Sequence, residues 1–228
     1  MIKIDLTPVV GNYDSFTQAK FDYGPTTLIP IFEIEIENVP DDEYIKNGID
    51  WSIKQSTNNS LRIPTFQAVT NDDDKLNLLV NEISDEAIFK MFDELDGVNK
   101  RIFSGYYGYD TSKPSSEFFK RNLNINKDIL KDNNINVFPP HFDGRNTFGT
   151  IIINLTDNET ATQFFDYRDK NKLIYTAPTQ KGKGVFWINC ETTFHGYGID
   201  INNIQSSTGL VRNDFRYALL ANITLKII

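Results

Sequence analysis

Short strand-like segments separated by turn signals dominate the C-terminal part of this chain. The first, residues 147–155, has the continuous apolar pattern of a buried strand, and a polar turn at 156–158 follows it. Further strand patterns lie at 162–168, 172–176, 184–189 and 215–225. We interpret residues 181–184 as a hairpin turn, because they lack the spacing of a phosphate-binding loop. The series predicts a mainly β fold.

The last strand pattern, residues 215–225, has two different faces, because side chains alternate across a strand. One face is wholly apolar and is expected to pack under helices; it consists of Phe215, Tyr217, Leu219, Ala221, Ile223 and Leu225. The other face is mixed and consists of Arg216, Ala218, Leu220, Asn222 and Thr224. We expect this mixed face to line a ligand cavity.

The N-terminal part combines one clear strand with helices. Apolar and acidic residues alternate over residues 31–37, which predicts a half-buried strand with a solvated Glu row. A carboxylate-rich metal or acid–base site is the alternative for that row. Helices are predicted over about 40–54, from the N-cap Ser84 to Gly97, and over a short stretch at about 115–123. We expect them to lie against one sheet, with one or two additional strands.

Two prolines, Pro139 and Pro140, precede a histidine and an acidic residue. Proline favours an extended backbone, in which residues i and i+2 point to the same side. His141 and Asp143 therefore present an imidazole and a carboxylate together. These are two of the three ligands of the facial triad that holds non-haem Fe(II) with open positions.

A facial triad of this kind needs a second histidine, and His195 is the other of the two histidines in the chain. A motif as short as His-x-Asp is a weak signal by itself, and either histidine could be an ordinary surface or core residue. The chain order is more specific. The motif comes first, then the strand patterns, then His195, and then a last strand that carries Arg216.

In this order the chain resembles the Fe(II)- and 2-oxoglutarate-dependent oxygenase superfamily over about residues 138–225. The resemblance is carried by His141-Phe142-Asp143-Gly144, by Gly184-Val185-Phe186-Trp187 leading to His195, and by Phe215-Arg216-Tyr217-Ala218-Leu219. It implies a double-stranded β-helix, or jelly-roll, core with flanking helices. We expect one domain over 1–228, in which a mixed α/β region, 1–136, supports a jelly-roll catalytic core, 137–228.

The resemblance also implies cofactors. His141, Asp143 and His195 would bind Fe(II), and Arg216 would pair with the far carboxylate of 2-oxoglutarate. The chain departs from the family pattern at Ala218, which stands where the hydroxyl of an Arg-x-Ser motif is often found. The gap from His195 to Arg216 is also longer than usual.

Two other arginines are weaker candidates for the 2-oxoglutarate role. Arg212 precedes Asn213 and Asp214 and is expected in the turn before the last strand. Arg145 lies beside the His-x-Asp motif and is expected to be an exposed turn residue.

The activity that the resemblance implies is that of a dioxygenase. It would couple decarboxylation of 2-oxoglutarate to hydroxylation of a small molecule or an amino-acid side chain, with O₂ as co-substrate and succinate and CO₂ as products. A cupin-like metalloenzyme that does not use 2-oxoglutarate is one alternative. A binding or structural module that keeps the fold without catalysis is the other.

Composition limits the partners and the compartment. The net charge of −8 and the lack of a basic segment interleaved with aromatics argue against a nucleic-acid partner. The single cysteine, Cys190, excludes an internal disulfide and is typical of a reducing compartment. No apolar run approaches the length of a membrane span, and the N-terminus lacks the pattern of a secretion signal. We expect a cytoplasmic protein that acts on a small-molecule or peptidyl substrate.

Overall fold

The computed structural model of this chain describes part of its length. The described residues are 4–8, 19–21, 24–26, 31–37, 39–49, 51, 55–56, 65–68, 82, 119–129, 138–144, 147–158, 160–166, 172–189, 193–199 and 215–225. The helix expected from Ser84 to Gly97 lies outside these residues, and so do Arg145 and Arg212.

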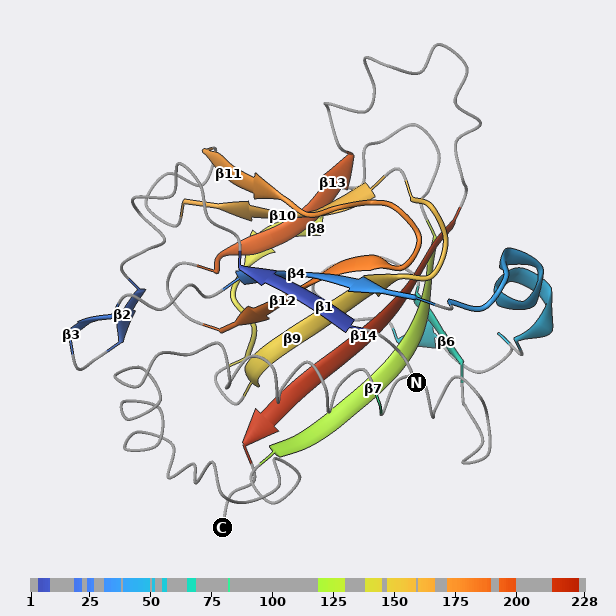
Figure 1. Cartoon of the computed structure of the whole chain (residues 1–228), viewed down its shortest axis with the longest axis horizontal. Coiled ribbons are helices and arrows are strands. Elements are labelled where there is room, and N and C mark those ends of the chain that lie inside the picture. The colour runs from blue at the N-terminus through green and yellow to red at the C-terminus, as the bar shows by residue number, and fades with distance from the viewer. Residues whose placement is uncertain are drawn as a thin grey trace.

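Two antiparallel sheets make up the body of the described structure (Figure 1). The larger sheet contains, in spatial order, β1 (Ile4–Pro8), β4 (Ile31–Ile36), β12 (Lys183–Ile188), β9 (Thr147–Asn154), β14 (Phe215–Leu225), β7 (Phe119–Ile129), β6 (Thr65–Ala68) and β5 (Gln55–Ser56). The smaller sheet contains β11 (Leu173–Thr176), β10 (Thr160–Phe165), β13 (His195–Ile199) and β8 (Phe138–His141). The strands β2 (Ala19–Phe21) and β3 (Gly24–Thr26) form a separate pair.

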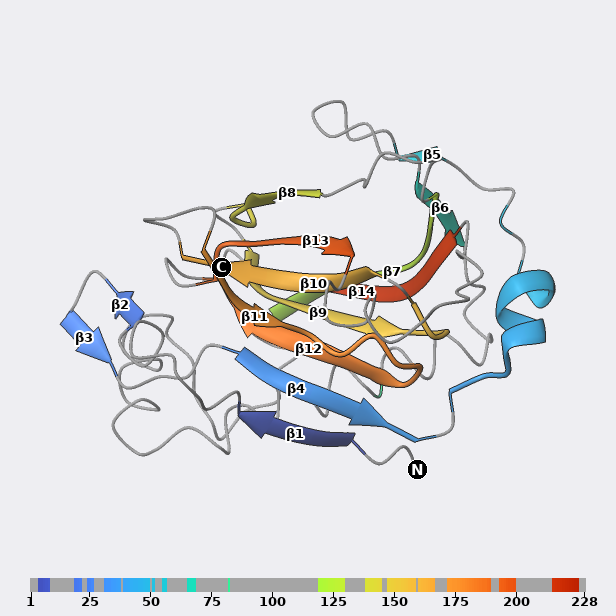
Figure 2. The same ribbon diagram turned by 90° about the horizontal axis from the view of Figure 1, so that it is seen from above.

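The connections between the two sheets define a jelly roll. From β7 onward the chain passes to β8 in the smaller sheet, returns to β9, crosses to β10 and β11, returns to β12, crosses to β13 and ends in β14 of the larger sheet. Figure 2 shows the smaller sheet lying as a second layer over the larger one. This alternation is the double-stranded β-helix, so the predicted fold class is confirmed.

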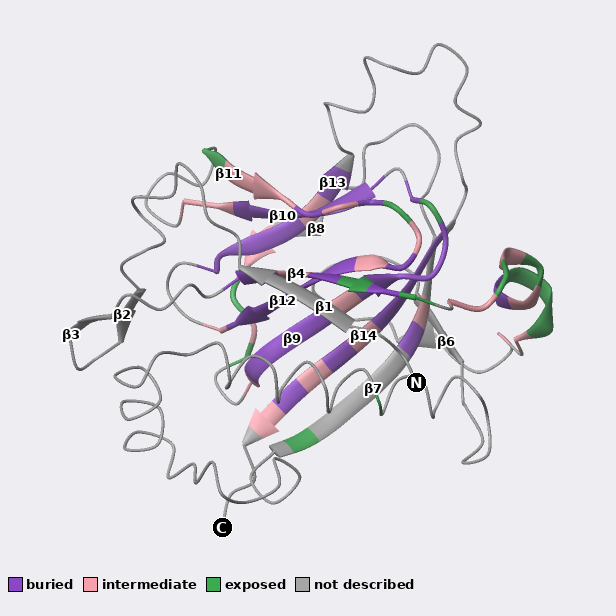
Figure 3. Cartoon of the chain, viewed as in Figure 1, coloured by how far each residue is buried: buried purple, intermediate pink, exposed green. Residues whose placement is uncertain are grey.

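The core lies between the two layers, where buried residues concentrate (Figure 3). A cluster of buried apolar side chains joins the sheets; it consists of Ile31, Phe164, Ala177, Val185 and Trp187. On the other face of the larger sheet, Phe32 stacks on Phe186 at 6.0 Å. β9, β12 and β14 are therefore buried on both faces, which explains their nearly continuous apolar sequences.

The alternating strand at the N-terminal side is confirmed as β4. Glu35 and Glu37 are exposed, as a solvated face requires, whereas Glu33 is half-buried and accepts a hydrogen bond of 2.5 Å from the Tyr175 hydroxyl. The alternative of a metal site in this row has no support among the described residues, because no Glu of β4 belongs to the cluster of metal-ligating side chains found there.

Three local predictions need correction. The short helix expected up to about residue 123 is wrong from Phe119 onward, because β7 begins there and pairs with β14 over its whole length. The helix expected over 40–54 is shorter: its last residues, Tyr44–Gly48, form a π-helical turn, after which Ile49 is extended.

Residues 181–184 do turn, with Gly182 at φ 78°, but they join β11 of one sheet to β12 of the other and are not a hairpin.

The larger sheet also takes more strands from the N-terminal region than expected. β1 and β4 extend one side of it, and β5, β6 and β7 extend the other. The division of the chain at residue 137 stays a prediction. Among the described residues, no helix is long and apolar enough to cross a membrane.

Candidate metal centre

The two histidines face each other across neighbouring strands of the smaller sheet. His141 is the last residue of β8 and His195 is the first residue of β13, and the antiparallel register pairs them directly. Their ring centroids are 4.6 Å apart. Strand pairing thus brings together two side chains that are far apart in the sequence.

Asp143 completes a cluster of three possible ligands. Ligand atoms of His141, Asp143 and His195 all lie within 4.8 Å of one another. Oδ1 of Asp143 is 3.7 Å from Nε2 of His195, which is too long for a hydrogen bond. The distance is shorter than two metal–ligand bonds of about 2.0–2.2 Å laid end to end, so one ion can bridge these atoms. The structure therefore brings together the three residues that the sequence predicts as ligands.

A backbone contact fixes which nitrogen of His195 faces the cluster. Nδ1 of His195 is 2.8 Å from the carbonyl oxygen of Thr193. A carbonyl only accepts, so Nδ1 carries the proton and the lone pair of Nε2 points toward Asp143. The Thr193 hydroxyl in turn donates to the Ile188 carbonyl at 2.9 Å, which ties this loop to the end of β12. Support of this kind is typical of metal-binding histidines.

Burial keeps His195 neutral. The side chain is enclosed by Phe164 and Trp187, whose rings lie 5.8 and 4.5 Å from its own. The pKa of His195 is lowered to about 4, chiefly by desolvation and also by the neighbouring His141, although Asp143 and the Thr193 carbonyl act to raise it. Neutral imidazole is the form that binds a metal, so the protein holds His195 ready for coordination at physiological pH.

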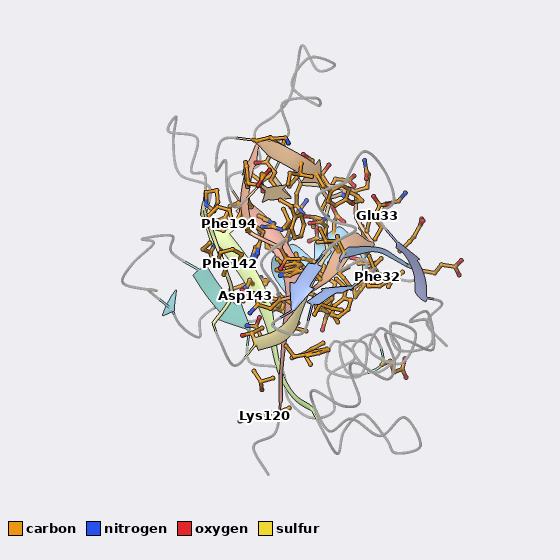
Figure 4. All side chains as sticks on the ribbon, turned by 90° about the vertical axis from the view of Figure 1, so that its left-hand side faces the viewer. Phe32, Glu33, Lys120, Phe142, Asp143 and Phe194 are labelled. Atoms are coloured by element: carbon orange, nitrogen blue, oxygen red, sulfur yellow. The ribbon has the colours of Figure 1, made fainter. Side chains whose placement is uncertain are left out.

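The loop that carries Asp143 is held from two directions. The Asn189 side-chain amide lies within 3.4 Å of the carbonyl oxygens of Asp143, Gly144 and Thr147. On the outer side Phe142 packs against Phe194 with ring centroids 4.9 Å apart. Figure 4 shows Phe142, Phe194 and Asp143 close together.

Two residues that contact the candidate ligands were not predicted as site residues from the sequence. Thr150 and Trp187 both donate hydrogen bonds to Oδ2 of Asp143, at 2.7 and 3.1 Å. Both residues lie in predicted strands, but their position opposite Asp143 depends on how the two sheets pack. No local pattern in the sequence carries that information.

Arg216 is buried in the interior, where no described carboxylate compensates its charge. It is 3% exposed, its guanidinium lies 4.9 Å from the ring centroid of Tyr197, and one terminal nitrogen is 3.5 Å from the Thr162 hydroxyl. Within the described part of the chain no carboxylate pairs with it, and its Nε has no hydrogen-bond partner. A buried charge without a partner is costly, so this arrangement is suited to an anionic ligand.

Two other buried polar atoms lack a partner in the described part of the chain: Oδ1 of Asn126 and Oγ1 of Thr160. Asn126 is the register partner of Ala218, on the face of β14 that carries Arg216. Thr160 lies two residues before Thr162 on β10, and therefore on the same face. The unpartnered atoms all belong to the inner faces of the sheets.

The strand register relates Arg216 to the histidine cluster. On adjacent strands Thr162 pairs with Tyr197, and Phe164 pairs with His195. The residues that contact Arg216 are thus two positions along the same inner face from His195, or about 7 Å along the strand. The expected placement of Arg216 on an inward face is in agreement with the structure.

Comparisons with known proteins support the fold. A structure from Shewanella oneidensis, described as a candidate oxygenase, is 12% identical, and the match covers 92% of this chain and 83% of that one with a TM-score of 0.50. A structural similarity at such low sequence identity shows a shared fold and no more. No protein-family model and no curated protein matches the sequence.

Two further solved structures match more weakly. One is the dioxygenase for auxin oxidation 1 of Arabidopsis thaliana, in complex with 2-oxoglutarate, at 8% identity and a TM-score of 0.45; the match covers 72% of this chain and spans 64% of that protein. The other is an oxidoreductase of the 2-oxoglutarate–Fe(II) oxygenase family from Burkholderia pseudomallei, at 10% identity and a TM-score of 0.37, covering 71% and 67% of the two chains.

Proposed function

We propose that this protein is an Fe(II)- and 2-oxoglutarate-dependent dioxygenase that hydroxylates a small molecule or an amino-acid side chain. The observation that carries the proposal is the buried guanidinium of Arg216, which no described carboxylate pairs with and which contacts Thr162 and Tyr197 on the inner face that also holds His195. A cation that could pair with a carboxylate therefore lies near a cluster of metal-ligating side chains.

The donor set of the cluster fits Fe(II). Two imidazoles and one carboxylate, from His141, His195 and Asp143, match the facial triad of non-haem iron oxygenases, which leaves positions open for other ligands. When bound, the iron would supply the O₂ chemistry, with 2-oxoglutarate converted to succinate and CO₂ as the substrate is hydroxylated. The protein's own residues supply the ligands, exclude water from His195 and keep that imidazole neutral.

Arg216 would bind the far carboxylate of 2-oxoglutarate. A guanidinium makes two charge-assisted hydrogen bonds to one carboxylate, and Nε is free for one of them. Thr162, whose hydroxyl is 3.5 Å from the guanidinium, would supply the hydroxyl that is absent at Ala218. The other end of the same molecule would then lie toward the histidine cluster.

The two alternatives explain Arg216 less well. A cupin-like enzyme without 2-oxoglutarate provides no anion to offset the cost of burying this charge. A structural module would gain more from an apolar side chain of similar volume at this position. Both alternatives leave the guanidinium without a role.

For the primary substrate we propose a small molecule or an amino-acid side chain and not a polynucleotide. Proteins that bind nucleic acid neutralise phosphates with a basic surface, and this chain has a net charge of −8. Salt-dependent binding to DNA or RNA, with a steep loss of affinity between low and high salt, would contradict this part of the proposal.

Calorimetry of 2-oxoglutarate binding to Fe(II)-loaded protein under anaerobic conditions tests the proposal. Arg216→Ala should weaken binding by about 2–5 kcal/mol, the range for truncating one partner of a buried charge pair, with little change in metal affinity. Lys183→Ala is the matched control, because it removes a cation that is 40% exposed and lies 3.8 Å from Glu35 of β4. Undiminished affinity in Arg216→Ala would rule out the assigned role, and no binding to the wild type would favour the cupin-like alternative.

A further inference from the structure

We propose that Trp187 and Thr150 are positioning residues that hold Asp143 so that it ligates the metal through Oδ1 alone. The inference rests on the proposed function, because it concerns the same metal centre. It assigns a role to two residues of the larger sheet that are not themselves ligands.

The hydrogen bonds to Asp143 divide its two oxygens. Thr150 Oγ1 and Trp187 Nε1 both donate to Oδ2, at 2.7 and 3.1 Å. A carboxylate oxygen offers two lone-pair sites, so both sites of Oδ2 are occupied. Oδ1 faces Nε2 of His195 at 3.7 Å and is the oxygen left for an ion.

The larger sheet is built to make this contact. Thr150 and Trp187 are register partners on β9 and β12, so their side chains leave the sheet on the same side. On the other side of Thr150, its register partner on β14 is Asn222. The three residues form one row across the sheet, directed at Asp143.

Asn222 lies beside the Thr150 hydroxyl without displacing it from Asp143. Its side-chain oxygen, Oδ1, is 3.2 Å from Thr150 Oγ1. A hydroxyl has one proton, and the contact of Thr150 Oγ1 with Oδ2 of Asp143 is shorter, at 2.7 Å. Thr150 therefore donates mainly to Asp143.

Trp187 contacts two of the three candidate ligands at once. Its indole N–H binds Asp143, and its ring lies 4.5 Å from the ring of His195. The side chain is completely buried and its edge packs on Phe164 at 5.5 Å, so it cannot rotate away without disturbing the core. One rigid side chain thereby sets the position of a carboxylate relative to an imidazole.

Coordination through a single oxygen matters for the proposed activity. If each of the three ligands supplied one atom, a bound Fe(II) ion would keep positions open for the 2-oxo acid and O₂. A carboxylate that turned and bound through both oxygens would occupy one of these positions. Trp187 and Thr150 prevent that rotation by holding Oδ2.

A purely structural role makes a different prediction. A buried tryptophan usually finds a partner for its N–H, and Trp187 would then contribute to stability without affecting the metal. The two roles are separated by measurements on bound metal in folded protein. Co(II) is a suitable probe, because its visible absorption spectrum reports coordination.

The experiment titrates metal-free protein with Co(II) and records affinity, spectrum and melting temperature. Trp187→Phe keeps a ring against His195 but removes the N–H, and Thr150→Val keeps the shape but removes the hydroxyl. Each should bind Co(II) about 10–100-fold more weakly, as is typical when a partner of a metal ligand is lost. The double variant should also show a changed spectrum, because Asp143 is then free to turn.

Two control variants accompany these. Trp51→Phe removes the other tryptophan of the chain, whose N–H donates to the Ile45 carbonyl at 3.1 Å, and should leave Co(II) binding unchanged. Thr150→Ser keeps the hydroxyl and should bind like the wild type. If Trp187→Phe does not fold, the isosteric Thr150→Val carries the test alone.

The outcomes separate this inference from the proposed function. Wild-type Co(II) affinity and spectrum in Trp187→Phe and Thr150→Val would overturn the positioning role and leave the metal centre standing. No Co(II) binding by the wild type would overturn both the metal centre and the positioning role.

Discussion

The indole ring of Trp187 lies 4.5 Å from the imidazole of His195, and its N–H is directed at Asp143. The larger sheet therefore closes over a centre whose possible ligands come from the β8 and β13 side of the molecule. This contact removes water from His195, which explains the depressed pKa of that residue. Because His195 is kept from water, the free energy of unfolding should depend on pH.

The stability of the metal-free protein should fall as the pH drops from about 6.5 to about 4. The pKa of His195 is about 4 in the folded protein and 6.5 in its ordinary state, so between these values the unfolded chain binds a proton that the folded protein does not. The contribution of neutral His195 to the free energy of unfolding is fully present above the pKa of the unfolded chain. It is lost as the pH falls toward the folded pKa, and the total loss is about 3 kcal/mol. Urea unfolding at a series of pH values measures this.

His195→Gln is the control for that titration, because glutamine does not ionise. The difference in unfolding free energy between wild type and His195→Gln should change with pH inside this window and stay constant above it. A difference that is independent of pH from 7 to 4 would contradict the buried, neutral state of His195.

Replacing Arg216 by Met should stabilise the protein in the absence of 2-oxoglutarate. The guanidinium is buried and unpaired by any described carboxylate, and an apolar side chain of similar length avoids the cost of burying charge, by about 1–4 kcal/mol. The same variant should lose 2-oxoglutarate binding. Urea midpoints of the two ligand-free proteins give the comparison, and a marked loss of stability in Arg216→Met would show that the residue has a structural role instead.

Gly184→Ala should destabilise the jelly roll strongly. A Cβ at Gly184 would lie 2.0 Å from the Ile152 carbonyl oxygen and 2.8 Å from the Ile153 Cα, both in the backbone of β9, which has no room to move. Overpacking of this kind costs about 1–3 kcal/mol or more. Gly144→Ala is the matched control, since its nearest neighbour would be the Thr147 hydroxyl at 4.0 Å. Equal melting temperatures for the two variants would contradict the close approach of β12 and β9.

Much of the core could be predicted from the sequence because its strands are buried on both faces. β9, β12 and β14 have nearly continuous apolar sequences bounded by turn residues, and β4 alternates clearly. β7 was missed for the opposite reason. Its sequence is rich in Asn and Lys, and it is a strand because it pairs along the whole of β14, a long-range effect that its own sequence does not show.

The candidate ligands could be predicted because the chain contains few side chains of the required types. The chain has two histidines, one of them two residues from an aspartate, and an arginine inside a strong strand. The residues that hold these groups in place could not be predicted. Thr150, Trp187 and Asn222 form a row through strand register and reach Asp143 through sheet packing, and neither is encoded in a local pattern.

In the complex that we propose, one molecule of 2-oxoglutarate lies between the metal and Arg216. If so, metal and 2-oxoglutarate must strengthen each other's binding by the same factor, because coupling between two ligands is reciprocal. Anaerobic calorimetry of 2-oxoglutarate with metal-free and Fe(II)-loaded protein measures that factor directly. We predict at least about a tenfold gain in affinity on loading with Fe(II), corresponding to about 1.4 kcal/mol, and no gain in His195→Ala. Equal 2-oxoglutarate affinity with and without Fe(II) in the wild type would contradict the account.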